Sequence, residues 1–264
     1  MIARHFLRLQ RGALVGWSLI LFLLSLASGA SAAAVQDQAN AAALMNSLPP
    51  TLQKLAGVDL ILGSHPVDGF LAMKWFLLLP VILGIYGALT AAAIVARENE
   101  RGTIGYLLAL PVQRGRLLRE RFLTLAGALA WLYFVDVVGL LVGLKSVDLT
   151  GTPGRWALLM LGYYAVNLAQ AGLTLLFSLY LPSWSRSVQA GAGLVIGLFL
   201  IDTGLAMADV PMLGRAPFLY GLTDVRGALL HGQLPWPALL VGLCLTILTI
   251  TLAERRFARQ QITA

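Results

Sequence analysis

Six long apolar segments constrain this chain more than any other feature of its sequence. A helix needs about 20 mostly apolar residues to cross the hydrocarbon core of a bilayer. The segments that reach this length lie at about 13–34, 70–96, 122–144, 156–181, 188–208 and 236–253. Only 12% of the 264 residues are charged, whereas about a quarter are charged in a soluble domain. We therefore predict an all-α membrane protein with six transmembrane helices.

The remaining sequence adds no second domain. We see no self-similarity with a period of about 20–50 residues, so we predict one membrane domain over residues 1–264. The single cysteine, Cys244, excludes an internal disulfide or a thiolate metal site. Pro80 predicts a kink in the second span. Gly139-xxx-Gly143 and Gly193-xxx-Gly197 predict close helix contacts at the third and fifth spans.

Positive charge is divided unevenly between the two sides of the predicted membrane. Six spans place both termini on one side, and that side carries 13 of the 19 Lys and Arg residues. Cytoplasmic loops carry the excess of such residues, so we predict cytoplasmic termini in the cell (inner) membrane. The net charge of +7 is then a topology signal, and it does not indicate nucleic acid. The 13 residues are Arg4, Arg8, Arg11, Arg97, Arg101, Arg114, Arg116, Arg119, Arg121, Arg186, Arg255, Arg256 and Arg259.

The N-terminal residues allow two further alternatives. A basic start, an apolar run and a small-residue stretch ending at Ala34 resemble a cleavable signal peptide. The apolar run is long for that role, so we favour an uncleaved first span. Residues 1–12 suit either a short helix lying in the interface or a simple charged flank of the first span.

The segment between the second and third spans, residues 97–121, carries nine charges in 25 residues. Gly102 permits a bend, and Thr103 can cap a following helix. Ile104, Leu107 and Leu108 would share one face of that helix. A short cytoplasmic helix with an apolar face and charged flanks suits docking into a groove on a soluble partner. A loop that only anchors lipid headgroups is the alternative.

The same segment resembles the signature of ATP-binding-cassette exporter permeases of the second class, the ABC-2 type. The resemblance rests on the run Arg97-Glu98-x-Glu100-Arg101-Gly102-Thr103-Ile104-x-x-Leu107-Leu108-x-x-Pro111-Val112-x-Arg114. The closing Phe257-Ala258-Arg259-Gln260-Gln261-Ile262 is similar to the family's C-terminal motif. Gly105 and the Gln260-Gln261 pair depart from the residues usual in that family.

This resemblance implies a transporter subunit rather than an enzyme. Two permease copies, identical or related, would pair with two copies of a separate ABC ATPase that binds ATP and Mg²⁺. The chain itself has no phosphate-binding loop sequence. Segment 98–110 would be the coupling helix, and the cargo of this exporter would be hydrophobic or amphipathic. The coupling residues would be Glu98, Glu100, Arg101, Gly102, Thr103, Leu107 and Leu108.

A few polar residues interrupt the predicted spans. Asn167, Gln170, Thr174 and Ser178 recur on one face of the fourth span. They could line a substrate path, form a seam between two copies, or simply make hydrogen bonds between helices. Asp136 lies mid-span, where a buried carboxyl is either functional or held by a structural partner. Asp202 lies nearer the outer boundary.

Two other functional classes fit less well. A proton-coupled secondary transporter would use Asp136 as its proton carrier. A membrane-embedded enzyme would need clustered His, Asp or Glu residues, and His5, His65 and His231 are dispersed. We assign no metal site. Outside the spans, residues 209–235, broken by Pro211 and Pro217, and residues 38–62, broken at Pro49-Pro50, predict short helices at the outer surface.

Overall fold

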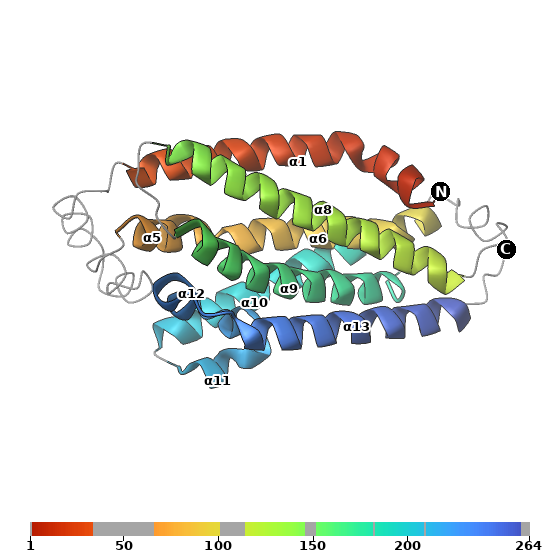
Figure 1. Cartoon of the computed structure of the whole chain (residues 1–264). Coiled ribbons are helices and arrows are strands. Elements are labelled where there is room, and N and C mark those ends of the chain that lie inside the picture. Colours follow the sequence, from red (N-terminus) through yellow and green to blue (C-terminus); the bar gives the residue numbers. More distant parts are fainter. Residues whose placement is uncertain are drawn as a thin grey trace.

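The computed structural model describes residues 2–33, 66–100, 114–145, 152–181, 183–208 and 210–259. In these ranges six helices are long and apolar enough to cross a membrane, and they pack as one all-helical bundle (Figure 1). The predicted fold class of six transmembrane helices is confirmed. The short helices predicted at 38–62 lie outside the described residues. Of the predicted coupling helix at 98–110, residues 98–100 belong to α6, and residues 101–110 lie outside the described ranges.

Two of the spanning helices extend beyond the apolar segments that predicted them. Helix α1 runs without a break over Ile2–Ala33, so no separate interfacial helix precedes the first span. Helix α8 covers Arg114–Gly143 and joins the arginine-rich stretch to the third span in one helix. Both extensions follow from residues with good helix propensity, Arg and Leu, at the boundaries.

The second span is broken on the N-terminal side of Pro80. It starts as α5 (Pro66–Leu71), widens into the π-helical turn η1 (Ala72–Phe76), and resumes as α6 (Leu79–Glu100). Proline lacks an N–H group and its ring clashes with the carbonyl four residues earlier, so a regular helix cannot pass through this point. The predicted interruption is confirmed, and the π turn directs Trp75 and Phe76 into the interior.

The last three spans are α9 (Thr152–Ser178), α10 (Trp184–Met207) and α13 (Trp236–Arg259). Helices α9 and α10 are joined by a short turn in which the Ser183 side chain accepts a hydrogen bond from the Arg186 N–H. Helix α1 begins and α13 ends at one end of the bundle, which we call the terminal end; α5 lies at the opposite, distal end (Figure 1).

Short helices between α10 and α13 occupy the distal end. They are α11 (Met212–Arg215), the 3₁₀ turns η2 (Ala216–Phe218) and η3 (Tyr220–Leu222), and α12 (Val225–His231). Pro211 immediately precedes α11, and Pro217 lies inside η2, because proline suits the first turn of a helix and not its interior. The prediction of short helices in 209–235 is confirmed.

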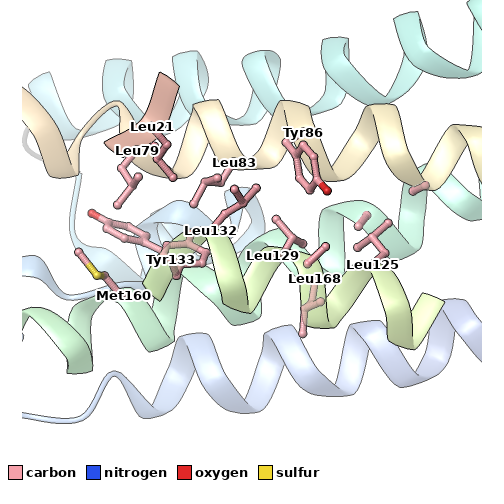
Figure 2. Close-up of a cluster of buried hydrophobic side chains, with 14 of the residues drawn as sticks. Leu21, Leu79, Leu83, Tyr86, Leu125, Leu129, Leu132, Tyr133, Met160 and Leu168 are labelled. Carbon is pink, nitrogen blue, oxygen red and sulfur yellow. The ribbon is translucent and has the colours of Figure 1, made fainter. Parts of the chain in front are cut away.

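Helix α9 is the centre of the bundle and contacts α6, α8, α10, α12 and α13. Within the most apolar 18 residues of each span, 78% are buried for α9 and 72% for α6, but only 17% for α10 and 22% for α1. Figure 2 shows the core between α6, α8 and α9, which includes Leu83, Leu129 and Leu168. The outer faces of α1, α10 and α13 expose large apolar side chains, as a surface facing lipid requires.

Helices α1 and α8 pack backbone to backbone through glycines. A Cβ atom at Gly139 would lie 2.9 Å from the Phe22 carbonyl oxygen, and one at Gly143 would lie 2.9 Å from the Ala30 nitrogen. Small residues allow such close approach in membranes, so the contact predicted from Gly139-xxx-Gly143 is confirmed. Gly193 and Gly197 differ, because no described heavy atom lies within 4 Å of a Cβ built at either position.

Candidate functional site

The polar face of α9 is buried inside the chain. Asn167, Gln170 and Thr174 are each 0% exposed, and Ser178 is 3% exposed. Glycines on both neighbouring helices make room for this face: a Cβ at Gly84 of α6 would lie 2.9 Å from Gln170 Oε1, and one at Gly191 of α10 would lie 2.6 Å from Thr174 Oγ1. These residues therefore occupy a seam between α6, α9 and α10 within a single chain.

Hydrogen bonds satisfy this seam only in part. Asn167 Nδ2 donates to the Tyr133 hydroxyl of α8 at 2.9 Å, and the Tyr220 hydroxyl of η3 donates to Gln170 Oε1 at 3.3 Å. Burial raises the pKa of Tyr220, so its hydroxyl keeps the proton that it donates. Asn167 Oδ1 and Gln170 Nε2 have no hydrogen-bond partner among the described residues. We call Tyr133, Asn167, Gln170, Thr174 and Tyr220 the amide seam.

Asp136 belongs to a different part of the interior. Its Oδ1 accepts hydrogen bonds from the Ser25 hydroxyl of α1 and, at 2.8 Å, from Trp75 Nε1 of η1. Its Oδ2 has no partner among the described residues. The carboxyl group is fully buried and ties α1, the π turn and α8 together. We call Asp136, Ser25 and Trp75, with the glycine contact of α1 and α8, the aspartate seam.

The structure thus separates the residues that the sequence grouped as polar exceptions. Asn167, Gln170 and Thr174 come together, whereas Asp136 faces α1. Tyr133 lies one helical turn before Asp136 and bonds to Asn167, so α8 contributes to both seams. No sequence pattern singles out Ser25, Trp75, Tyr133 or Tyr220, because serines and aromatic residues are common in transmembrane helices for other reasons.

A cleft of about 430 Å³ opens at the distal end between α9, α10 and the short helices. Apolar residues such as Phe199 and Pro80 form part of its wall, together with Tyr163 and Tyr220. Asp202 of α10 and Arg215 of α11 form a two-pronged ion pair in it, with both nitrogen–oxygen distances at 2.9 Å. The sequence patterns did not predict this cleft, because neither residue of the ion pair belongs to a motif.

The terminal end holds the charged ends of four helices. Glu100 is exposed and is the last residue of α6, while Glu98 lies two residues before it in the same helix. The Arg97 guanidinium lies 5.6 Å from the centre of the Trp184 ring, at the start of α10. Arg119 of α8 pairs with Glu254 of α13 at 2.8 Å. The other predicted coupling residues, Arg101, Gly102, Thr103, Leu107 and Leu108, lie outside the described residues.

Nothing in the described part of the chain gathers three His, Cys, Asp or Glu side chains into a metal-binding group. The buried polar side chains of the described residues are amides, hydroxyls, the carboxyls of Asp68, Asp136 and Asp202, and the Arg121 guanidinium. Hydrogen bonds involving these groups join the helices. Together with the six spans, this arrangement is that of a multi-pass membrane protein.

The chain belongs to the ABC-2 family of transporter proteins, because the sequence model of the "ABC-2 family transporter protein" matches residues 6–219. It is therefore the membrane subunit, or permease, of an ABC transporter. A similar relative is the probable multidrug ABC transporter permease YbhS of Escherichia coli strain K12, which is 27% identical over 165 residues. That alignment covers 59% of this chain and 42% of the relative.

The corresponding permease of Escherichia coli O157:H7 matches equally well, with the same identity and coverage. The chain thus matches less than half of the length of these relatives. No solved structure matches the sequence significantly. The comparisons establish the family and leave the cargo and the partners to argument from the residues.

Proposed function

We propose that this chain is the permease of an ATP-driven exporter. Two permease copies, identical or related, would assemble with two copies of a separate ATPase, which would bind ATP and Mg²⁺. The observation that carries the proposal is family membership over residues 6–219. The inner residues offer hydroxyl and amide groups on an otherwise apolar background, which suits a hydrophobic or amphipathic cargo.

The terminal end would face the cytoplasm of a cell whose inner membrane holds the bundle. All 13 Lys or Arg residues assigned to that side are arginines, and such an excess favours the cytoplasmic side. Helix α6 ends at Glu100 and α8 begins at Arg114, so both flank the predicted coupling segment. The ATPase would dock on that segment.

Two contacts support transmission of movement from the docking segment into the bundle. Arg121 of α8 is buried, and its Nη1 donates to the Ile94 carbonyl oxygen of α6 at 2.8 Å. Arg97 of α6 lies over Trp184 of α10. Closure of the ATPase dimer would draw two coupling segments together, and α6, α8 and α10 would move with them.

Charge reversal in the docking segment tests the proposal. We expect Glu98→Lys with Glu100→Lys to abolish ATP-dependent transport without loss of membrane insertion, because the carboxylates would face basic groups of the ATPase. Glu120→Lys is the matched control. Among the described residues, Glu120 pairs with the exposed Arg116, one turn away on α8, and a pair at the surface contributes about 0–1 kcal/mol. Unchanged transport by the double variant would refute the assignment.

The alternative is a proton-coupled transporter that uses Asp136. Family membership favours the ATP-driven exporter, and the two hydrogen bonds onto one oxygen of Asp136 suit a carboxyl that fixes helices. Purification from native membranes distinguishes the two functions. Recovery of an ATP-binding protein with this chain supports the exporter, and transport driven by a proton gradient without ATP supports the alternative.

A further inference from the structure

The short helices at the distal end, residues 210–231, cover the end of the amide seam that lies toward the distal end of the bundle. They are held to the spanning helices at separate points. Arg215 pairs with Asp202 of α10, Tyr220 bonds to Gln170 of α9, and Arg155 of α9 donates to the Leu229 carbonyl oxygen at 3.1 Å. We call residues 210–231 the distal cover.

The fit between the cover and α10 is close and includes strained backbone. A Cβ at Gly221 would lie 2.7 Å from Asp202 Oδ1, so only glycine lets η3 approach the ion pair this closely. Leu219, between η2 and η3, has a φ of 65°, which is rare for a residue with a branched side chain. Such strain persists only where surrounding contacts enforce it.

The ion pair is the strongest of these contacts. The side chains of Arg215 and Asp202 are 25% and 9% exposed, and they share two parallel hydrogen bonds. Two-pronged arginine–carboxylate pairs are strong and directional. Loss of one partner leaves the other charge poorly solvated, so removal of either residue should weaken the attachment of the distal cover to α10.

We propose that the distal cover is a gate and that the Asp202–Arg215 pair latches it closed over Gln170. The inference rests on the proposed exporter function for its role in release of cargo. Opening the gate would free the Tyr220 hydroxyl from Gln170 and connect the amide seam to the cleft. Asn167 Oδ1 and Gln170 Nε2, which lack partners among the described residues, would then be available to polar groups of a cargo.

Helix α10 connects this latch to the terminal end. It carries Asp202 near its distal end and Trp184 at its start, beside Arg97. It is also the least buried of the spanning helices, so it can shift with few broken contacts. A displacement of α6 at the docking segment therefore moves the helix that carries the latch carboxylate.

Cysteine accessibility tests the latch. The native Cys244 is replaced by Ser, and Thr223→Cys provides a reporter. Thr223 belongs to the cover, is 6% exposed and packs against α9, where its methyl group would be 3.2 Å from a Cβ at Gly162. The full chain is placed in lipid nanodiscs without ATPase or ATP, and the rate of labelling by a charged maleimide is measured.

We expect Arg215→Gln and Asp202→Asn each to raise the labelling rate roughly tenfold, as loss of a buried charge partner does. The double variant should label no faster than the faster single variant, because both changes remove the same contact. Arg116→Gln, which breaks an exposed arginine–carboxylate pair within α8 and outside the cover, should leave the rate unchanged.

A second reporter separates gate opening from unfolding. Ser178→Cys places this reporter at the far end of α9, where the native serine is 3% exposed. Its labelling should therefore stay slow in all latch variants. The proposal is overturned if the single variants label Thr223→Cys at the background rate, or if their effects multiply in the double variant. It is also overturned if both reporters respond together.

The outcome is separable from the proposed function. The measurement without ATP tests the latch alone, and a second measurement adds the copurified ATPase and ATP. Suppose that the latch variants raise the labelling of Thr223→Cys, but that ATP does not change its labelling in the chain with native Asp202 and Arg215. The gate proposal is then supported, and the proposed coupling to an ATPase is refuted.

Discussion

The aspartate seam and the amide seam both bury polar groups in the membrane interior, yet they are built differently. In the aspartate seam, glycines bring the backbones of α1 and α8 into contact, and Asp136 of α8 accepts hydrogen bonds from α1 and η1. In the amide seam, side chains meet side chains, and Tyr220 belongs to the distal cover. Each seam contains polar atoms without partners among the described residues, so the difference lies in the backbone contact and in the cover. The first arrangement resists movement and the second permits it.

This difference assigns separate tasks to the two seams. A backbone contact between helices offers no alternative packing, because interiors are close-packed and deform little. A hydrogen bond between a tyrosine and a glutamine can be exchanged for one to water or to a cargo at little net cost. We expect variants in the aspartate seam to lose stability and variants in the amide seam to lose transport.

The largest effect is expected from Gly143→Leu. A Cβ at this position would clash with the Leu26 carbonyl oxygen and lie 3.1 Å from the Gly29 Cα atom. Overpacking typically costs about 1–3 kcal/mol, and the obstacle here is backbone, so we expect the upper end or loss of folded protein. Gly127→Leu is the control, since that position of α8 has open space. Thermal unfolding in detergent measures the stability of both variants. Equal stability would contradict the special role of the backbone contact in the aspartate seam.

The next effect is expected from Asp136→Ala, which removes the acceptor of the Trp75 and Ser25 bonds. An unsatisfied buried donor costs about 1–3 kcal/mol, so the unfolding temperature should fall. Asp136→Asn retains an acceptor oxygen, so its unfolding temperature should fall less, and its transport should be preserved. If the asparagine variant is stable but inactive, Asp136 has a function beyond holding helices, and the division of tasks fails.

A smaller change in stability is expected from Gln170→Leu. The lost bond to Tyr220 is worth about 1 kcal/mol, whereas transport should fall severalfold because the seam loses its amide. The control is Ser178→Ala on the same face of α9, because within the described residues the Ser178 hydroxyl donates to the Leu175 carbonyl oxygen of its own helix. Both variants are compared for unfolding temperature and for ATP-dependent transport. Equal transport by the two variants would contradict a role for the amide.

The smallest effect on stability is expected from Trp184→Leu. Its contact with Arg97 is a cation–π interaction of about 0.5–1 kcal/mol at such partly exposed sites. Transport per ATP hydrolysed should nevertheless fall, because α10 loses its link to α6. Tyr180→Leu is the control, since its ring lies 5.1 Å from the guanidinium of Arg256 on α13. A similar loss in both variants would show that the link to α6 is not special.

The spans and their interruption were predictable from the sequence because each depends on local chemistry. Apolar length alone located six helices, and the missing N–H of Pro80 located the break. The helical repeat placed Asn167, Gln170 and Thr174 on one face, and the glycine spacing at 139 and 143 located the contact with a neighbour. The ends of α1 and α8 were less predictable, since charged residues continue a helix as readily as they end it.

The partners of the polar groups depend on packing that no local pattern encodes. Trp75 and Asp136 are 61 residues apart, and Ser25 and Asp136 are 111 apart. Arg215 meets Asp202 only because α11 folds back over the end of α10. The sequence by itself determined a six-span permease of the ABC-2 type. The tertiary structure alone decided which buried groups fix helices and which lie beneath a latched cover, because that depends on which side chains distant in sequence come within hydrogen-bonding distance.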